Sequence, residues 1–204
     1  MKTYSRTLIG LVMMFVITFS SASQACVPPA FERVAFEYDV PADIFYSIAL
    51  AESGRSTNEF GFKVWPWALN INKKSFYPES KQAALVMIEQ AISQGSDQFD
   101  VGLMQVSWRF HKTTFKANAN YALDVGANIR AGAKIFSEFL SQADDVWQAV
   151  GFYNAGASKR ATSLKAAKFY SDRVKRIYNK YVKEGCDESL IACLLYTSPS
   201  PRDS

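Results

Sequence analysis

Glu52 closes an apolar helical segment, and a carboxyl in that position can do acid–base chemistry. Each residue of an α-helix turns by about 100°. With Ile44 set at zero, Ile48 falls at about 40° and Glu52 at about 80°, so the carboxyl projects from the apolar face. Poor solvation raises the pKa of such a carboxyl, and a carboxyl that stays protonated near neutral pH can act as a general acid. The alternative is a glutamate that swings into water at a frayed helix end.

Other residue types narrow the chemistry further. The nearest further acids in the sequence are Glu59, Asp97 and Asp100. His111 is the only histidine, and the cysteines lie towards the chain ends. This pattern indicates neither a metal cluster nor a Cys/His pair, so we expect no metal and no cofactor.

Helical patterns surround these residues. Apolar spacing and capping residues predict helices over residues 31–38, 41–52, 81–93, 125–140, 144–153 and 165–181. Residues 60–77 are aromatic and broken by proline, which is typical of an irregular strand or hairpin. We find no repeats and no internal linker. The predicted fold is mainly α, a single helical domain with a small irregular β insertion.

The first 25 residues have the three parts of a secretory signal peptide. Lys2 and Arg6 precede an apolar run, and Ser23-Gln24-Ala25 offers small residues at the cleavage site. The run is short for a membrane span, which needs about 20 apolar residues. We therefore expect an exported, periplasmic protein without a transmembrane segment after cleavage. A retained N-terminal anchor is the alternative.

Residues 193–204 have a different origin. The run from Cys193 to Asp203 resembles the translation of a transposase adapter used in sequencing libraries, so we exclude it from the folded domain. A native tail rich in Pro and Ser is the alternative. The expected domain spans residues 26–192.

Cys26 and Cys186 then remain as an even pair. In an oxidising compartment such a pair favours one disulfide that ties the two ends of the domain together. Lipidation of Cys26 is the competing interpretation, although Ser23-Gln24-Ala25 is a poor match to a lipoprotein signal.

The net charge of +4 is small, but basic residues gather late in the chain. Residues 159–183 hold nine Lys or Arg against Asp172 alone. Such a flank favours an anionic envelope polymer as partner, while a solvated helix face is the simpler interpretation. No nucleic-acid motif is present.

Three short motifs follow one another in the chain. They are Ala49-Leu50-Ala51-Glu52-Ser53, Gly102-Leu103-Met104-Gln105-Val106 and Phe152-Tyr153-Asn154-Ala155-Gly156. Together they resemble the family-1, soluble-type lytic transglycosylase domain, which has a goose-type lysozyme-like α+β fold. The late Tyr170-Ser171-Asp172-Arg173-Val174 resembles the final helix of that family. The resemblance covers about residues 31–181.

The resemblance implies roles for six residues. Glu52 corresponds to the catalytic acid/base, and Ser53 to a serine that holds substrate or the glutamate. Met104 and Gln105 correspond to the floor of a saccharide groove. Tyr153 and Asn154 correspond to the pair that faces the glutamate, where the tyrosine hydroxyl positions the carboxyl. Without the resemblance, Met104 and Tyr153 read as ordinary core, and Gln105 and Asn154 as turn residues.

Two features depart from the family pattern. Gly151-Phe152 stands where alanine commonly precedes the tyrosine, which alters the packing behind Tyr153. The segment with Trp65 and Trp67 is longer and more aromatic than a minimal domain, and resembles a subgroup that serves conjugation or type IV secretion. The two tryptophans either line sugar subsites or cap the core.

The family's activity implies cleavage of peptidoglycan between N-acetylmuramic acid and N-acetylglucosamine, leaving a 1,6-anhydromuramoyl end. A lysozyme that activates water through Asp97 or Asp100 is one rival. A non-catalytic peptidoglycan-binding component of an envelope machine is the other.

Overall fold

A computed structural model of the chain describes residues 27–58 and 61–183. Several features predicted from the sequence lie outside these residues: the signal peptide, the tail from residue 193, the pairing of Cys26 with Cys186, and Glu59. Among the described residues, no helix combines the length and apolar character needed to cross a bilayer.

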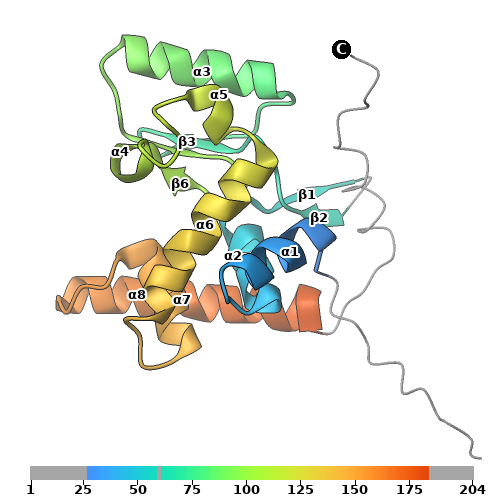
Figure 1. The fold of residues 1–204 in the computed structure, drawn as a ribbon, viewed down its shortest axis with the longest axis vertical. Coiled ribbons are helices and arrows are strands. Elements are labelled where there is room, and N and C mark those ends of the chain that lie inside the picture. The colour runs from blue at the N-terminus through green and yellow to red at the C-terminus, as the bar shows by residue number, and fades with distance from the viewer. Residues whose placement is uncertain (1–26, 59–60, 184–204) are drawn as a thin grey trace, which may run out of the picture.

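Helices make up most of the described chain, as predicted (Figure 1). They are α1 (Pro29–Glu37), α2 (Ala42–Ser53), α3 (Lys81–Ser93), α4 (Trp108–His111), α5 (Ala119–Ala122), α6 (Val125–Leu140), α7 (Val146–Ala155), α8 (Ala161–Ile177) and a π-helical turn η1 (Tyr178–Lys183). The bounds of α3 and α6 agree with the prediction, α8 begins four residues earlier, and the four-residue helices α4 and α5 were not predicted.

The β insertion consists of two small antiparallel sheets. Two strands, β1 (Arg55–Thr57) and β2 (Gly61–Lys63), form the first. The second has the order β4-β3-β5-β6, with β3 (Leu69–Ile71), β4 (Lys74–Phe76), β5 (Phe99–Val101) and β6 (Val106–Ser107). This sheet lies with α3, α4 and α5 on one side of the molecule, and α1, α2, α7 and α8 lie on the other, while α6 runs between them (Figure 1).

The second helix, α2, is buried on every side. Phe45, Ile48 and Ala49 are fully buried, and α2 packs against α1, α8 and η1. The Phe45 ring lies 5.5 Å from Phe31 and stacks on Phe136 of α6 at 6.3 Å between centroids. The glutamate at the C-terminal end of α2 is therefore only partly exposed.

A tight turn connects β5 to β6 and carries Gly102-Leu103-Met104-Gln105. Gly102 has φ +77°, and a Cβ there would come within 2.5 Å of the Asn128 amide, so only glycine fits. Buried Asn128 fixes this turn with three hydrogen bonds: it accepts from Met104 N at 2.9 Å and donates to Val101 O at 2.9 Å and Ala122 O at 3.1 Å. One amide on α6 therefore holds the turn, β5 and α5 together.

Among the described elements, helices α7 and α8 share the most extensive contact. A Cβ on Gly151 would lie 2.8 Å from the Ala167 carbonyl oxygen, so glycine at this position permits the approach. The next residue, Phe152, makes an edge-to-face contact with Phe139 at 6.2 Å. The departure at Gly151-Phe152 thus brings α8 close to α7, with the aromatic ring packed on α6.

We predict that Asn128→Ala destabilises the protein by about 2–4 kcal/mol, because Val101 O and Ala122 O would lose their buried donor. Denaturant unfolding would measure the change. Asn120→Ala, at an exposed position, is the matched control and should stay within about 0.5 kcal/mol of wild type. Equal stability of the two variants would contradict the role given to Asn128.

Candidate active site

A cavity of about 450 Å³ opens beside Glu52. Its polar lining comes from several elements far apart in the sequence: Glu52, Asp100, Gln105, Ser107, Tyr153 and Asn154. Its apolar lining consists of Val106, Phe110, Ile135, Phe139 and Phe152, and His111 also reaches it. The cavity lies within the size range of small-molecule sites and has their usual mixture of apolar walls and a few polar groups.

Glu52 is the group in this cavity whose environment is most unusual. Burial raises the pKa of its carboxyl from 4.5 to about 7, since the charged form is poorly solvated there. A hydrogen bond from the Tyr170 hydroxyl, 2.5 Å from Oε1, and the nearby Arg173 act in the opposite direction. Asp100 adds a smaller effect that raises the pKa further. The carboxyl is therefore poised to exchange a proton near neutral pH.

Arg173 stabilises the end of α2 that carries Glu52. Its Nη2 donates to Ala51 O at 2.6 Å, a carbonyl in the last turn of the helix. The C-terminus of a helix carries partial negative charge, which disfavours an ionised carboxyl and is favoured by a cation. Arg173 and Tyr170 both belong to α8, so this helix supplies the groups that hold Glu52 from one side.

Asp100 is the second carboxyl of the cavity. It lies on β5, opposite Ser107 of β6, and burial raises the pKa of its carboxyl while the Ser107 hydrogen bond lowers it. Asp97, in contrast, forms a half-exposed ion pair with Arg109 at 3.5 Å. Of the acids considered from the sequence and described in the structure, Asp100 is the one that shares the cavity with Glu52.

The structure brings four of the six predicted site residues together. Glu52, Gln105, Tyr153 and Asn154 all line the cavity. Gln105 has φ +46°, and its side-chain amide donates to Ala68 O at 3.0 Å and Gly102 O at 2.8 Å. These bonds secure the turn in a conformation that non-glycine residues rarely adopt.

Ser53 and Met104 do not lie where the resemblance placed them. Ser53 is fully buried, its hydroxyl donates to Ala49 O at 3.3 Å, and it accepts from Trp65 N at 3.3 Å. Met104 has no exposed surface and packs beneath Gly132, where a Cβ would come within 2.7 Å of its side chain. Both side chains point into the core because the helix end and the tight turn leave no other space.

The tyrosine that contacts Glu52 is also not the one predicted from the resemblance. Tyr153 donates to Met104 O at 3.0 Å, whereas Tyr170 donates to Glu52. Burial raises the pKa of the Tyr153 phenol, and the nearby Glu52 carboxyl raises it further. Tyr170 was noted in the sequence only as part of the last helical motif, and its contact depends on how α8 packs on α2, 118 residues away.

The two tryptophans have different surroundings. The indole N–H of Trp65 donates to Pro78 O at 2.7 Å, and the Arg55 guanidinium lies 5.2 Å from its ring. Trp67 is partly buried against the hydrophobic core. Neither is among the side chains that line the cavity beside Glu52. The core-capping alternative is favoured for Trp67, whereas Trp65 contacts Arg55 and Pro78.

Metal ligands do not gather in this site. Within residues 27–58 and 61–183, no group of three or more His, Cys, Asp or Glu side chains is placed to hold an ion. His111 stands alone at the cavity edge, where burial lowers the pKa of its imidazole.

We predict that Glu52→Gln stabilises the protein at alkaline pH. Below the unfolded pKa of 4.5 the wild-type carboxyl is protonated in both states, so the two proteins differ little. Between pH 4.5 and about 7 the unfolded wild type is ionised while the folded protein still holds its proton, so the wild type loses stability progressively relative to the variant. The full loss, up to about 3 kcal/mol, is present above the folded pKa of about 7.

Denaturant unfolding at about pH 4 and about pH 8 measures this difference. Glu89→Gln, at an exposed position on α3, controls for the loss of one negative charge. A Glu52→Gln effect that does not depend on pH would show that the carboxyl ionises in the folded protein as it does in water.

Comparisons with known proteins agree with this geometry. The transglycosylase SLT domain model matches residues 29–175. The chain is 28% identical to the invasion protein IagB of Salmonella typhi over 124 residues, which cover 58% of this chain and 75% of that protein. No solved structure matches significantly.

Proposed function

The chain belongs to the transglycosylase SLT domain family, and on this basis we propose that it is a peptidoglycan lytic transglycosylase with Glu52 as its catalytic acid/base. The observation that carries the proposal is the carboxyl of Glu52, which lies in a cavity and has a pKa of about 7. A general acid works best when its pKa is close to the operating pH.

In the first step, protonated Glu52 donates its proton to the glycosidic oxygen between N-acetylmuramic acid and N-acetylglucosamine. The bond from that oxygen to the anomeric carbon breaks, and the N-acetyl oxygen of the muramoyl residue stabilises the positive charge that develops. Tyr170 and Arg173 stabilise the carboxylate that remains on Glu52.

In the second step, ionised Glu52 takes the proton from the 6-hydroxyl of the same muramoyl residue. Oxygen 6 then bonds to the anomeric carbon and closes a 1,6-anhydro ring. The proton returns to Glu52 and no water is consumed, so the reaction is that of a lyase. Gln105, Tyr153 and Asn154 line the cavity beside this carboxyl and are assigned to substrate binding.

Asp100 supports a second candidate function. A muramidase that hydrolyses the same bond needs a second carboxyl beside the first, and Asp100 shares the cavity with Glu52. In this alternative Asp100 activates water or stabilises the charged sugar. The released ends would then be reducing sugars rather than anhydro sugars.

We assign the enzyme to the cell wall of the periplasm, reached through the signal peptide predicted for residues 1–25. The basis is the sequence pattern Lys2–Ala25 and the substrate class of the family. Service to a conjugation or type IV secretion apparatus rests on the resemblance of the Trp65–Trp67 segment to that subgroup. The similarity to a protein named for invasion is a second reason to propose a partner machine.

Digestion of purified peptidoglycan sacculi tests the activity. We expect wild-type protein to release muropeptides with 1,6-anhydro ends, detected by mass spectrometry, and Glu52→Gln to reduce release by at least about 10²-fold because the proton donor is lost. Asp100→Asn should keep anhydro products.

Two other results would point elsewhere. Reducing ends that disappear in Asp100→Asn would identify a muramidase. Binding of sacculi without release by wild type, unchanged in Glu52→Gln, would identify a non-catalytic binding component.

We also predict the pH dependence of kcat/KM. Activity should fall as pH rises through about 7, since the free enzyme must hold a protonated Glu52.

Tyr170→Phe removes the hydrogen bond that lowers the pKa of Glu52, so the alkaline limb of the pH profile should move to higher pH. Tyr153→Phe is the matched control. It loses its bond to Met104 O and should leave the limb in place. If the alkaline limb had the same midpoint in both variants, Tyr170 would not be the residue that lowers the pKa of Glu52.

A further inference from the structure

Helix α8 and the turn η1 concentrate the positive charge of the chain. Seven Lys or Arg and a single acidic residue, Asp172, lie between Ala161 and Lys183. The whole chain has a net charge of only +4, so the rest of the sequence carries a slight negative balance. The charge asymmetry therefore belongs to one continuous helical segment of the fold.

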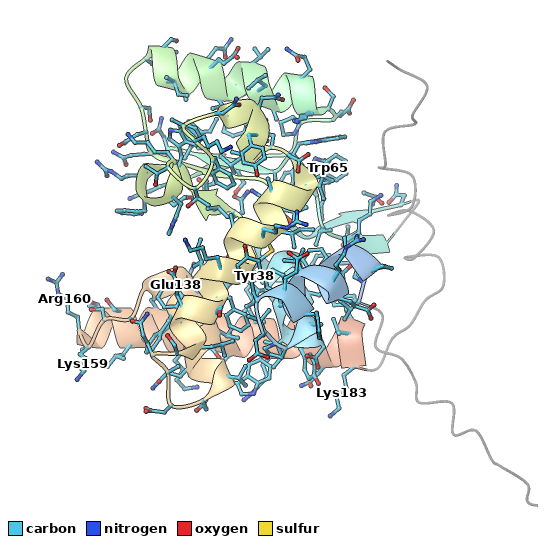
Figure 2. All side chains as sticks on the ribbon, viewed as in Figure 1. Tyr38, Trp65, Glu138, Lys159, Arg160 and Lys183 are labelled. Carbon is cyan, nitrogen blue, oxygen red and sulfur yellow. The ribbon has the colours of Figure 1, made fainter. Side chains whose placement is uncertain are left out.

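The cations of this segment face away from the protein. Ala167, Tyr170 and Val174 form the buried side of α8. Lys165, Phe169 and Arg176 lie within about 40° of one another on the opposite side. The helix forms an outer edge of the molecule, and Lys159, Arg160 and Lys183 point outwards at its two ends (Figure 2).

Several of these cations lack an internal partner. Lys168 pairs with Asp172 at 2.8 Å, Lys175 lies 4.7 Å from the Trp147 ring, and Arg173 is bound to Ala51 O. Among the ion pairs of the described residues, none involves Lys165, Arg176 or Lys183. Asp172, the acid of the segment, is thus neutralised locally, and the outward charge remains.

An apolar side chain stands in the middle of this charged edge. Phe169 is 72% exposed and lies one helical turn from Lys165. Leu164, 48% exposed, lies about 140° round the same helix and is not part of this face. Cations alone would fit any anionic polymer, but cations around an outward phenylalanine fit a surface with anionic head groups above an apolar layer.

We propose that the outward face of α8 and η1, with Lys165, Phe169 and Arg176 along its length and Lys183 at its end, docks the protein onto an anionic phospholipid membrane. Electrostatic attraction holds the cations at the head groups, and Phe169 enters the boundary with the acyl chains. The apolar side of α8 stays packed on the protein core, so the domain binds without unfolding.

This docking fixes the orientation of the candidate active site. Tyr170, next to Phe169 in the sequence, lies about 100° further round α8, on its buried side, and contacts Glu52. The β sheet with α3, α4 and α5 lies across the molecule from α8 (Figure 1). A membrane beneath α8 therefore leaves Glu52 on the side that faces away from the lipid. The proposal itself does not depend on glycan cleavage.

Vesicle co-sedimentation tests the proposal. We expect wild-type protein to bind vesicles of equal parts phosphatidylglycerol and phosphatidylcholine but not vesicles of pure phosphatidylcholine. High salt should release the bound protein. Lys165→Glu with Arg176→Glu should lower the partition coefficient at least about twentyfold, since each basic residue near an anionic leaflet contributes about fivefold. Phe169→Ser should lower it about tenfold.

Matched variants separate this surface from general effects. Lys74→Glu with Lys112→Glu makes the same charge change at exposed lysines elsewhere, and Phe36→Ser removes another exposed phenylalanine. Both should bind as wild type does. Every variant keeps the same N-terminal segment, and circular dichroism checks folding, so differences report on α8.

Two outcomes would overturn the proposal. One is equal vesicle binding by all variants. The other is a wild type that ignores anionic vesicles while the Lys165→Glu/Arg176→Glu variant loses binding to sacculi, which would make the wall polymer the partner of this face. Release of soluble muropeptides, measured in parallel, should be unchanged in the α8 surface variants, so a failure of docking is distinguishable from a failure of the proposed activity.

Discussion

The burial of one ionisable carboxyl is the constraint on which the site depends. Most of helix α2 is buried, and its last turn places Glu52 at the wall of a cavity, where the side chain is only partly exposed. Burying a carboxyl away from water is costly unless it is protonated or its charge is compensated by hydrogen bonds and cations. Here burial favours the neutral form, while Tyr170 and Arg173 lessen the cost of the ionised form. The balance leaves a carboxyl for which both states are accessible, which is what an acid that later acts as a base requires.

The rest of the fold serves to keep these groups close. Helix α8 packs directly on α2, and Gly151 lets it also lie close against α7. On the other side of the cavity, Asn128 secures the turn that presents Gln105, and Gly102 and Gly132 leave room for that turn against α6. Larger residues at these glycines would therefore displace the turn or α8.

Local patterns were sufficient to predict the long helices. Helices α3 and α6 have regular apolar spacing and N-terminal caps, Ser80 and Asp124, whose side chains accept from backbone N–H groups as such residues do. Helical phase placed Glu52 on the apolar face of α2 but left open a side chain that swings into water, and only the motif resemblance favoured the first alternative. Helices α4 and α5 have four residues each, too few to show a period.

The contacts of the site were harder to predict, since they depend on packing between distant elements. The partnership of Tyr170 with Glu52 spans 118 residues. Ser53 and Met104 were assigned to the groove through the resemblance, but the tight helix end and turn direct both side chains into the core. Asp100 was one acid among three candidates until the register of β5 with β6 placed it at the cavity. These are consequences of tertiary structure that no short motif contains.

The most direct test is a measurement of the ionisation of Glu52 itself. Carbon-13 NMR of glutamate side-chain carboxyls, with the Glu52 signal assigned by its absence in Glu52→Gln, would follow this group as pH changes. The account predicts a midpoint of about 7, well above the usual 4.5. A midpoint near 4.5 would mean that the carboxyl is fully solvated, and would contradict both its burial and its assignment as the proton donor.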